Sequence, residues 1–264
     1  MYDFAYHKAT SLDDAAKRIA GADSKLLAGG MSLIPGLKLR LNRYAALIDL
    51  GAVPELTGIR RDGNALVIGA MTPHAEVAAS TEVKLALPAL AALAEGIGDP
   101  LVRNRGTLGG SIAHADPAAD YPAAVVGLDA TVVTNRRSIA ADDFFTGVFE
   151  TALTRDEIIT AVRFPIPQRA AYAKLRQAAS RFAIVGVFAA HTKDSVRIAV
   201  TGAAPSVFRF SEAEAALSLR FEPAALDGIQ INAEGLNSDI HASSVYRAHA
   251  VVEMTRRAVA AALQ

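Results

Sequence analysis

Two short segments of the chain share a pattern that suits anion binding. Residues 28–32 read AGGMS and residues 107–111 read TLGGS, so each combines a small residue, two glycines close together and a serine. Because glycine has no side chain, backbone N–H groups stay unshielded there and can form a nest for an anion. A helix that starts at such a turn adds the positive end of its dipole. We call these the first and second glycine segments, and both predict diphosphate binding.

Neither glycine segment matches the two best-known phosphate-binding patterns. The P-loop requires Gly-x-x-x-x-Gly-Lys-Ser/Thr and the Rossmann fingerprint requires Gly-x-Gly-x-x-Gly, and both fit poorly here. Two carboxylates, Asp116 and Asp120, follow the second segment closely. A carboxylate repels phosphate but accepts hydrogen bonds from sugar or ribityl hydroxyls. The pattern therefore predicts an extended nucleotide with a diphosphate and a hydroxylated section.

Each of these features also has a structural interpretation. The chain contains 19 glycines, so one Gly-Gly turn taken singly is more often structural than functional. Asp116 and Asp120 flank Pro117 and can cap a helix that starts near Ala118, which is the interpretation we favour for Asp116. Phe182, which heads an apolar strand, would then be an ordinary core residue. Both interpretations stay open at this point.

The composition excludes several classes of function. Lys plus Arg equals Asp plus Glu at 27 each, so no overall field attracts nucleic acid. No apolar run is long enough to cross a bilayer and no secretory signal precedes the first helix, which predicts a cytoplasmic protein without a membrane segment. The absence of cysteine excludes disulfides, thiolate nucleophiles and iron–sulfur clusters ligated by this chain. The histidines are scattered, so we expect no metal site, and redox chemistry would need an organic cofactor.

Hydrophobic patterning predicts the elements that position the glycine segments. Residues 25–30 form a strand that runs into the first segment, and Ser32 is placed as the N-cap of the next helix. The pattern at residues 83–98 is helical and ends at Gly96, a plausible C-cap. Further elements are a helix at residues 12–20, strands at 45–50 and 156–165, and a strand followed by a helix start within residues 65–80. The strand at 156–165 is stopped by Pro165 and Pro167.

The prolines mark the domain boundary that we predict. Beyond it, residues 171–180, 182–191 and 195–205 are strand-like runs separated by short polar turns, which indicates an antiparallel meander. Alanine-rich helices near residues 211–219 and 246–263 would cover one face of that sheet. The expected domains are residues 1–167, divided at about residue 52 into two subdomains, and residues 168–264.

The combined motifs resemble one protein family. LLAGGMSLIPGLKLRL, LIDL, IGAMT and VRNRGTLGGSIAHADPAADYPA are similar in type and order to the FAD-binding subunits of molybdenum-containing hydroxylases. This family includes carbon monoxide dehydrogenase medium chains and xanthine dehydrogenase relatives. FFTGVFETALTRDEIITAVRFP and YAKLRQAASRFAIVGV continue the resemblance along nearly the whole chain. The resemblance implies an α+β fold, with a vanillyl-alcohol-oxidase (PCMH)-type FAD-binding domain of two subdomains and a C-terminal sheet-and-helix domain.

The resemblance also implies a set of cofactor-binding residues. The two glycine segments would wrap the FAD pyrophosphate, Asp120 would bind hydroxyls of the FAD chain, and Ile159 and Lys174 would approach the flavin. Phe182 stands where some relatives have a tyrosine beside the isoalloxazine, and Met31 stands where glutamine or histidine is common. The glycine segments contribute Ala28, Gly29, Gly30, Met31, Ser32, Thr107, Leu108, Gly109, Gly110 and Ser111.

The function implied by the resemblance is electron transfer. A molybdopterin large subunit would hydroxylate the substrate, an iron–sulfur small subunit would pass the electrons to FAD on this chain, and an external acceptor would take them. No catalytic side chain is required, and a dimer of heterotrimers is expected. Two alternatives stay open: a stand-alone FAD-dependent oxidase of the same fold, and a non-catalytic nucleotide-binding module. The substrate and the acceptor stay open as well.

Overall fold

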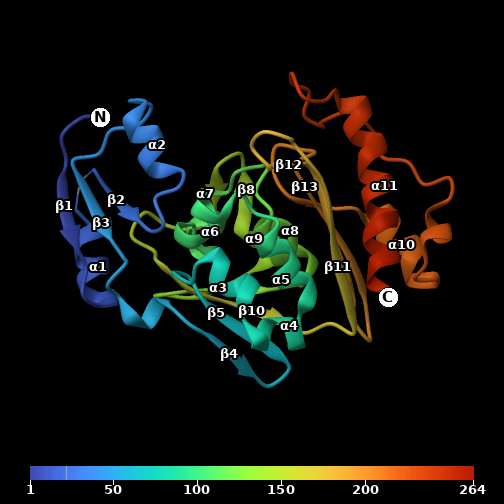
Figure 1. Cartoon of the computed structure of the whole chain (residues 1–264), viewed down its shortest axis with the longest axis horizontal. Helices are drawn as coiled ribbons and strands as arrows, with labels where there is room; N and C mark the ends of the chain where they lie inside the picture. The colour runs from blue at the N-terminus through green and yellow to red at the C-terminus, as the bar shows by residue number, and fades with distance from the viewer. Residues whose placement is uncertain (22) are drawn as a thin grey trace.

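The computed structural model describes residues 1–21 and 23–264. Figure 1 shows three sheet-containing parts side by side: a small N-terminal part in blue, a central part rich in helices, and a C-terminal sheet with the long helix α11 (Ser244–Ala262). Parallel and antiparallel sheets lie in separate regions of the chain. The predicted α+β class is therefore confirmed.

The N-terminal part is a three-stranded parallel sheet in the order β1-β3-β2. Helix α1 buries Ala15 and Ile19 against this sheet, and its N-cap Ser11 accepts a hydrogen bond from the Asp14 amide at 3.1 Å. Helix α2 connects β2 to β3, so the first glycine segment lies between β2 and α2. The bounds are β1 (Ala5–Lys8), α1 (Leu12–Ile19), β2 (Ser24–Leu27), α2 (Leu33–Lys38) and β3 (Ala46–Asp49).

The central part is a five-stranded antiparallel sheet in the order β4-β5-β10-β6-β7, with helices packed against it. Its strands are β4 (Ile59–Asp62), β5 (Ala65–Gly69), β6 (Thr131–Thr134), β7 (Ser138–Ala140) and β10 (Ile159–Pro165), and a small hairpin adds β8 (Phe145–Gly147) and β9 (Glu150–Thr151). Its helices are α3 (His74–Ala79), α4 (Thr81–Ala86), α5 (Pro88–Glu95), α6 (Pro100–Arg105), α7 (Leu108–His114), α8 (Tyr121–Gly127) and α9 (Ala141–Phe144). Short 3-10 helices lie at Pro54–Leu56 and Pro223–Leu226.

The C-terminal sheet is an antiparallel meander in the order β11-β12-β13-β14, as the strand runs predicted. Residues of β12 alternate between two cores. Val185 and Val187 pack with α10 and α11, whereas Phe188 joins the core of the central part. The sheet therefore lies between the central helices and α11 (Figure 1). The bounds are β11 (Arg169–Arg176), β12 (Ala183–His191), β13 (Val196–Thr201), β14 (Phe208–Arg209) and α10 (Ser211–Leu219).

The single helix predicted over residues 83–98 is wrong, because the chain forms α4 and α5 with a break between them. Leu87 joins the two helices, and Pro88 occupies the first turn of α5. Proline disfavours a helical conformation of the residue before it, which explains the break. Gly96 does follow the last helical residue, but its φ of −74° is right-handed rather than the left-handed conformation usual for a glycine cap.

Two predicted N-caps also need correction. Ser32 does stand at the N-cap position of α2, but its side chain makes no capping hydrogen bond. Asp116 accepts a hydrogen bond from the Ala118 amide at 2.8 Å, yet the helix starts at Tyr121 rather than near Ala118. The Asp116 contact is therefore a local turn and not a helix cap.

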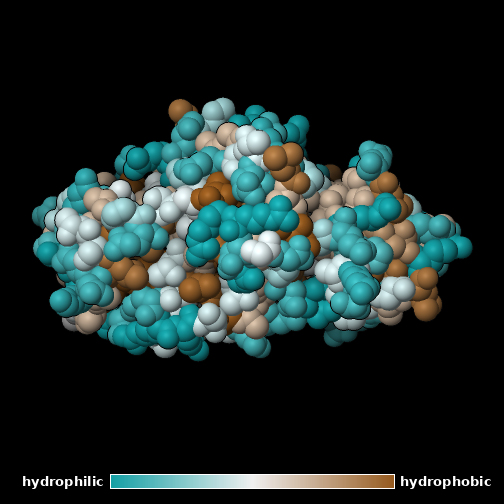
Figure 2. All heavy atoms as spheres, turned by 90° about the horizontal axis from the view of Figure 1, so that it is seen from below, coloured by the Kyte–Doolittle hydropathy of each residue, from teal (hydrophilic) through white to brown (hydrophobic). Residues whose placement is uncertain are grey.

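The surface in Figure 2 shows hydrophobic residues as separate patches among hydrophilic ones, without a continuous apolar band on the visible face. Within the part of the chain that the structure describes, no helix is long and apolar enough to span a membrane.

Candidate functional site

The structure brings the two glycine segments into contact, although they are far apart in the sequence. A Cβ on Gly110 would lie 3.3 Å from the Ala28 Cβ, and a Cβ on Gly29 would lie 2.0 Å from the Arg105 carbonyl oxygen. Real Cβ atoms do not approach a carbonyl oxygen this closely, so only glycine fits at position 29. The two segments therefore form the facing sides of one site between the N-terminal and central parts.

The first glycine segment leaves its backbone donors free. Within residues 1–21 and 23–264, no hydrogen bond is donated by the amides of Gly29, Gly30, Met31 and Ser32. Gly30 has a φ of +74°, a left-handed conformation that glycine adopts without strain. Gly29 and Gly30 are half-buried, and Met31 and Ser32 are exposed. Four consecutive free amides ahead of α2 form the kind of nest that accepts phosphate oxygens.

The second glycine segment differs from its prediction, because its amides are bound within the protein. It is no open turn but the first turn of α7, with Thr107 as N-cap. The Leu108 amide donates to the Thr72 carbonyl at 3.1 Å, and the Gly109 amide donates to the Ala70 carbonyl at 2.7 Å. The Gly110 amide donates to Thr107 Oγ1 at 3.1 Å. The expectation of unshielded donors in this segment is therefore wrong, and its backbone serves as a rigid support.

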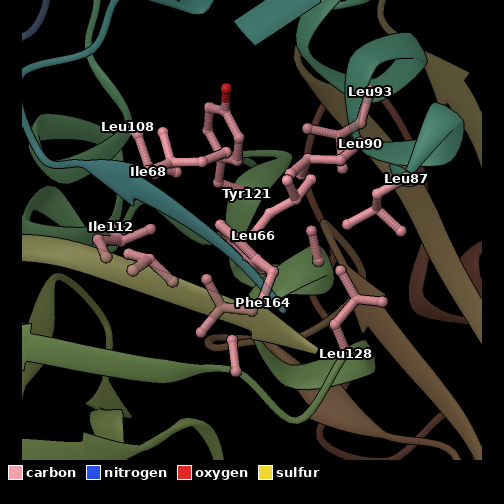
Figure 3. Packing of buried hydrophobic residues seen from close by; sticks show 14 of the residues in the cluster. Leu66, Ile68, Leu87, Leu90, Leu93, Leu108, Ile112, Tyr121, Leu128 and Phe164 are labelled. Carbon is pink, nitrogen blue, oxygen red and sulfur yellow. The ribbon is translucent and has the colours of Figure 1, made fainter. Parts of the chain in front are cut away.

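Close packing explains the glycines of the second segment. A Cβ on Gly109 would lie 2.5 Å from the Ala70 Cβ, because α7 runs against the end of β5. Leu108 and Ile112 of α7 are fully buried and point into the same core as Ile68 of β5 (Figure 3). This apolar anchoring fixes where Gly110 meets the first segment.

A buried histidine lies behind the second segment. The His74 amide donates to the Gly106 carbonyl at 2.9 Å, and a Cβ on Gly106 would lie 2.6 Å from His74 Nε2. Burial, with the nearby Arg103 guanidinium, lowers the pKa of His74 to about 4, so its ring is neutral at pH 7. In the described residues its Nδ1 has no hydrogen-bond partner. His74 thus packs against Gly106, the residue directly before the second glycine segment.

Asp120 and Lys174 form a buried ion pair at the N-terminal end of α8. Lys174 Nζ lies 2.8 Å from Asp120 Oδ1 and 2.9 Å from Oδ2, and it also donates to the Gly96 carbonyl at 3.2 Å. The Tyr172 hydroxyl donates to Asp120 Oδ1 at 2.5 Å. Side-chain exposure is 4% for Asp120 and 9% for Lys174, so the pair is shielded from water.

Burial sets the electrostatics of this ion pair. It raises the pKa of Asp120, while the charge of Lys174 and the hydrogen bonds from Lys174 and Tyr172 act in the opposite direction. Burial and the Asp120 charge together raise the pKa of Tyr172 well above its ordinary value. Tyr172 is therefore a neutral hydrogen-bond donor, and the two donors are what favour the ionised form of the carboxyl.

The remaining predicted residues lie in different surroundings. Ile159 is 5% exposed and packs in the same central core as Leu108 and Ile112 of α7. The carbonyl of the next residue, Thr160, accepts a hydrogen bond from the Ala70 amide at 2.9 Å. Phe182 is 45% exposed in the β11–β12 turn, where it lines a shallow surface hollow with Phe149. The Ile159 side chain thus points into the core, whereas the Phe182 ring is free to contact a ligand.

Sequence reasoning missed two residues of the site. Arg103 of α6 donates to the Ile97 carbonyl at 2.9 Å and to the Gly98 carbonyl at 3.1 Å, which ties the turn after α5 to the helix that precedes the second segment. Tyr172 was not singled out, although it stands two residues before Lys174 in a strand, and residues at that spacing share a face. The two-residue spacing between Tyr172 and Lys174 was therefore the sequence signal that could have identified Tyr172.

No metal centre accompanies these groups in the described ranges, since no cluster of three or more His, Cys, Asp or Glu side chains is found there. The arrangement instead fits an extended ligand with an anionic middle. Amides at residues 29–32 that donate no hydrogen bond within the described residues suit a diphosphate. The fold is α+β, and the geometry of this candidate site between the N-terminal and central parts suits a nucleotide cofactor.

Comparison with known proteins assigns the family. The sequence model described as "FAD binding domain in molybdopterin dehydrogenase" matches residues 2–167, so the chain belongs to this family of FAD-binding proteins. The predicted cofactor, FAD, and the oxidoreductase class are thereby confirmed. The predicted resemblance to molybdenum hydroxylase FAD subunits is confirmed as well.

The alignments with individual relatives cover between 78% and 99% of the chain. The carbon monoxide dehydrogenase medium chain of Hydrogenophaga pseudoflava is 40% identical over 78% of this chain and 77% of its own length. The nicotine 6-hydroxylase medium subunit of Paenarthrobacter nicotinovorans is 38% identical over 96% of this chain and 95% of its own. The solved carbon monoxide dehydrogenase of H. pseudoflava superposes with a TM-score of 0.89 at 37% identity, covering 99% of this chain and 98% of that chain.

Proposed function

We propose that the chain is the electron-transfer subunit of a molybdenum hydroxylase, which binds FAD with its diphosphate on the first glycine segment. One observation carries the proposal: the four consecutive amides of residues 29–32 donate no hydrogen bond within the described chain, and none of these residues is buried. Bound FAD would supply the redox chemistry. The chain's own task is to hold and orient the cofactor.

The proposed roles of the site residues follow from their surroundings. Residues 28–32 donate backbone hydrogen bonds to the pyrophosphate, and residues 107–111 support them through the contact of Gly110 with Ala28. Lys174 and Phe182 lie toward the flavin, with the Phe182 ring available for stacking. Asp120 faces the hydroxylated section of FAD while it holds Lys174, and Ile159 lends its backbone because its side chain is in the core.

The proposed partners are an iron–sulfur small subunit and a molybdopterin large subunit, assembled as a dimer of heterotrimers in the cytoplasm. Electrons from substrate oxidation on the large subunit would pass through the iron–sulfur clusters to FAD on this chain and then to an external acceptor. Relatives named as medium chains or medium subunits support this place in a larger assembly. Since the chain contains no cysteine, any thiolate-bound cluster must belong to another subunit.

We further propose the domain division 1–167 and 168–264, with the subdomain boundary near residue 52. The family match over residues 2–167 and the start of the C-terminal sheet at β11 (Arg169–Arg176) support it. Because Phe188 of β12 joins the central core, the C-terminal domain would be stabilised by its neighbour.

Calorimetric titration of the flavin-stripped chain with FAD, FMN and ATP tests the proposal. We expect tight binding of FAD and weak binding of FMN and ATP. The diphosphate of FAD joins its flavin half to its adenosine half, and the proposed site contacts both halves at once. Equal binding of FMN would contradict a role for the first glycine segment in diphosphate binding. Electron transfer is then tested by mixing the FAD-loaded chain with a reduced iron–sulfur subunit and following bleaching of the flavin absorbance.

A further inference from the structure

Tyr172 has a partly buried position that the proposed function does not explain. It lies on β11 two residues before Lys174, so both side chains leave the same face of the strand toward α5 and α8. Its hydroxyl donates to Asp120 Oδ1 at 2.5 Å, and Lys174 binds both oxygens of the same carboxylate. The Asp120 carboxylate therefore links the neutral Tyr172 hydroxyl to the charged Lys174 ammonium.

The neighbouring strand is shaped to admit the Tyr172 hydroxyl. Gly186 of β12 pairs with Lys174 of β11, and a Cβ on Gly186 would lie 2.2 Å from the Tyr172 hydroxyl oxygen. Any other residue at this position would displace the hydroxyl. The Tyr172 ring also stacks on Phe188, its paired residue on β12, with ring centroids 6.2 Å apart and an interplanar angle of 30°. Three residues of β11 and β12 thus cooperate to place one oxygen atom.

Helix capping does not position Asp120. Asp120 stands at the N-cap of α8, but its side chain accepts no hydrogen bond from the helix. Its carboxylate is instead bound by Tyr172 and Lys174, which come from the C-terminal sheet. Lys174 also reaches the Gly96 carbonyl at the end of α5, so its ammonium is held between α5 and α8.

We propose that Tyr172 is a positioning residue which, through Asp120, fixes the location and charge balance of the Lys174 ammonium beside the bound flavin. This inference rests on the proposed function, in which Lys174 lies toward the flavin. Asp120 and Lys174 carry opposite charges in a site shielded from water, where charges act strongly on their surroundings. The flavin gains negative charge on reduction, so an ammonium that its carboxylate no longer balances would favour the reduced form.

The midpoint potential of the FAD-loaded chain, measured by equilibrium reduction against a reference dye, tests the proposal. Asp120→Asn removes the negative charge, so the potential should rise. Tyr172→Phe removes one of the two donors that favour the ionised carboxyl, so the potential should shift in the same direction by a smaller amount. Gly186→Ala pushes the hydroxyl away without removing it, and it should reproduce the Tyr172→Phe shift.

Tyr121→Phe is the matched control, because it makes the same change in the adjacent buried tyrosine. In the described part of the chain the Tyr121 hydroxyl has no hydrogen-bond partner, and it points away from the surrounding core side chains (Figure 3). Tyr121→Phe should leave the potential at its wild-type value. An unchanged potential in both Tyr172→Phe and Gly186→Ala, or an equal shift in Tyr121→Phe, would overturn the proposal.

A second measurement separates this proposal from the proposed function. Labelling of Lys174 by an amine-specific reagent, followed by mass spectrometry, needs no flavin. In the flavin-free chain, Lys174 should be labelled faster in Tyr172→Phe than in the wild type and in Tyr121→Phe, because Asp120 loses the hydrogen bond that fixes it beside Lys174. If the wild type fails to bind FAD, the proposed function fails while the labelling still tests the positioning; if FAD binds and Lys174 labels equally in all three chains, only the positioning fails.

Discussion

The two glycine segments look alike in sequence but use their backbones in different ways. In the first segment the amides of residues 29–32 donate no hydrogen bond to any residue that the structure describes, and these residues lead into α2. In the second segment the amides of Leu108, Gly109 and Gly110 are bound by Thr72, Ala70 and Thr107. The free amides can bind a ligand, whereas the bound amides fix α7 as a support. A Gly-Gly pair therefore indicates that another group lies close to the backbone. Whether that group is a ligand or another part of the protein depends on the surrounding structure.

The strongest test of the support role is Gly109→Val. A Cβ on Gly109 would overlap Ala70, at 2.5 Å from its Cβ and 2.8 Å from its carbonyl oxygen. Overpacking of a buried position by a branched side chain should lower the free energy of unfolding by about 3 kcal/mol or more. Chemical denaturation of the flavin-free chain measures this loss. If the variant instead kept the wild-type stability but no longer bound FAD, Gly109 would face the ligand, and the second segment would not be a mere support.

Acidification should also weaken the second segment, through His74. Its folded pKa of about 4 lies below its ordinary value of 6.5, so the folded state binds fewer protons and stability falls as the pH falls between these values. The loss should be roughly 1.5 kcal/mol between pH 6.5 and pH 5. Denaturation across this range measures it, and His74→Phe, which cannot titrate, is the comparison. If the free energy of unfolding changed equally with pH in the wild type and in His74→Phe, protonation of His74 in the folded state would carry no free-energy cost.

Much of the fold was predictable because its signals are local. The strand leading into the first segment, the meander of β11 to β13 and helix α10 (Ser211–Leu219) follow from short-range hydrophobic patterns. The break at Pro88 was also visible in the sequence but was outweighed by the helical spacing around it. Local chemistry was thus a reliable guide to elements and less reliable for their ends.

The site was only partly predictable because its decisive contacts are long-range. Unshielded backbone amides were expected in the first segment, and in the described part of the chain the amides of residues 29–32 donate no hydrogen bond. The partners of the second segment, Thr72 and Ala70, come from the end of a distant strand, so nothing near residues 107–111 signals that these amides are bound. Tyr172 was missed for the same reason, since its partner Asp120 lies 52 residues away.

A smaller effect is expected in the first segment from Gly30→Ala. At a φ of +74° an alanine is strained by about 1 kcal/mol, and its Cβ would also press on the Ile34 side chain at 3.0 Å. The distorted nest should bind FAD about tenfold more weakly, which corresponds to 1.4 kcal/mol. Gly63→Ala is the control, because Gly63 has a φ of +59° with nothing near its Cβ position. Titration calorimetry should show normal FAD binding for this control, and an equal loss in both variants would point to general strain.

The finest distinction concerns the residue that starts each helix. Thr107 Oγ1 accepts the Gly110 amide at 3.1 Å, whereas Ser32 makes no capping hydrogen bond. Thr107→Val keeps the side-chain shape but removes the acceptor, so the free energy of unfolding should fall by roughly 0.5 to 1 kcal/mol. Ser32→Ala removes no bond and should change stability by less than about 0.5 kcal/mol. Because both substitutions delete one hydroxyl oxygen at a helix start, a larger loss from Ser32→Ala in the flavin-free chain would reverse the assignment of support and ligand-binding roles.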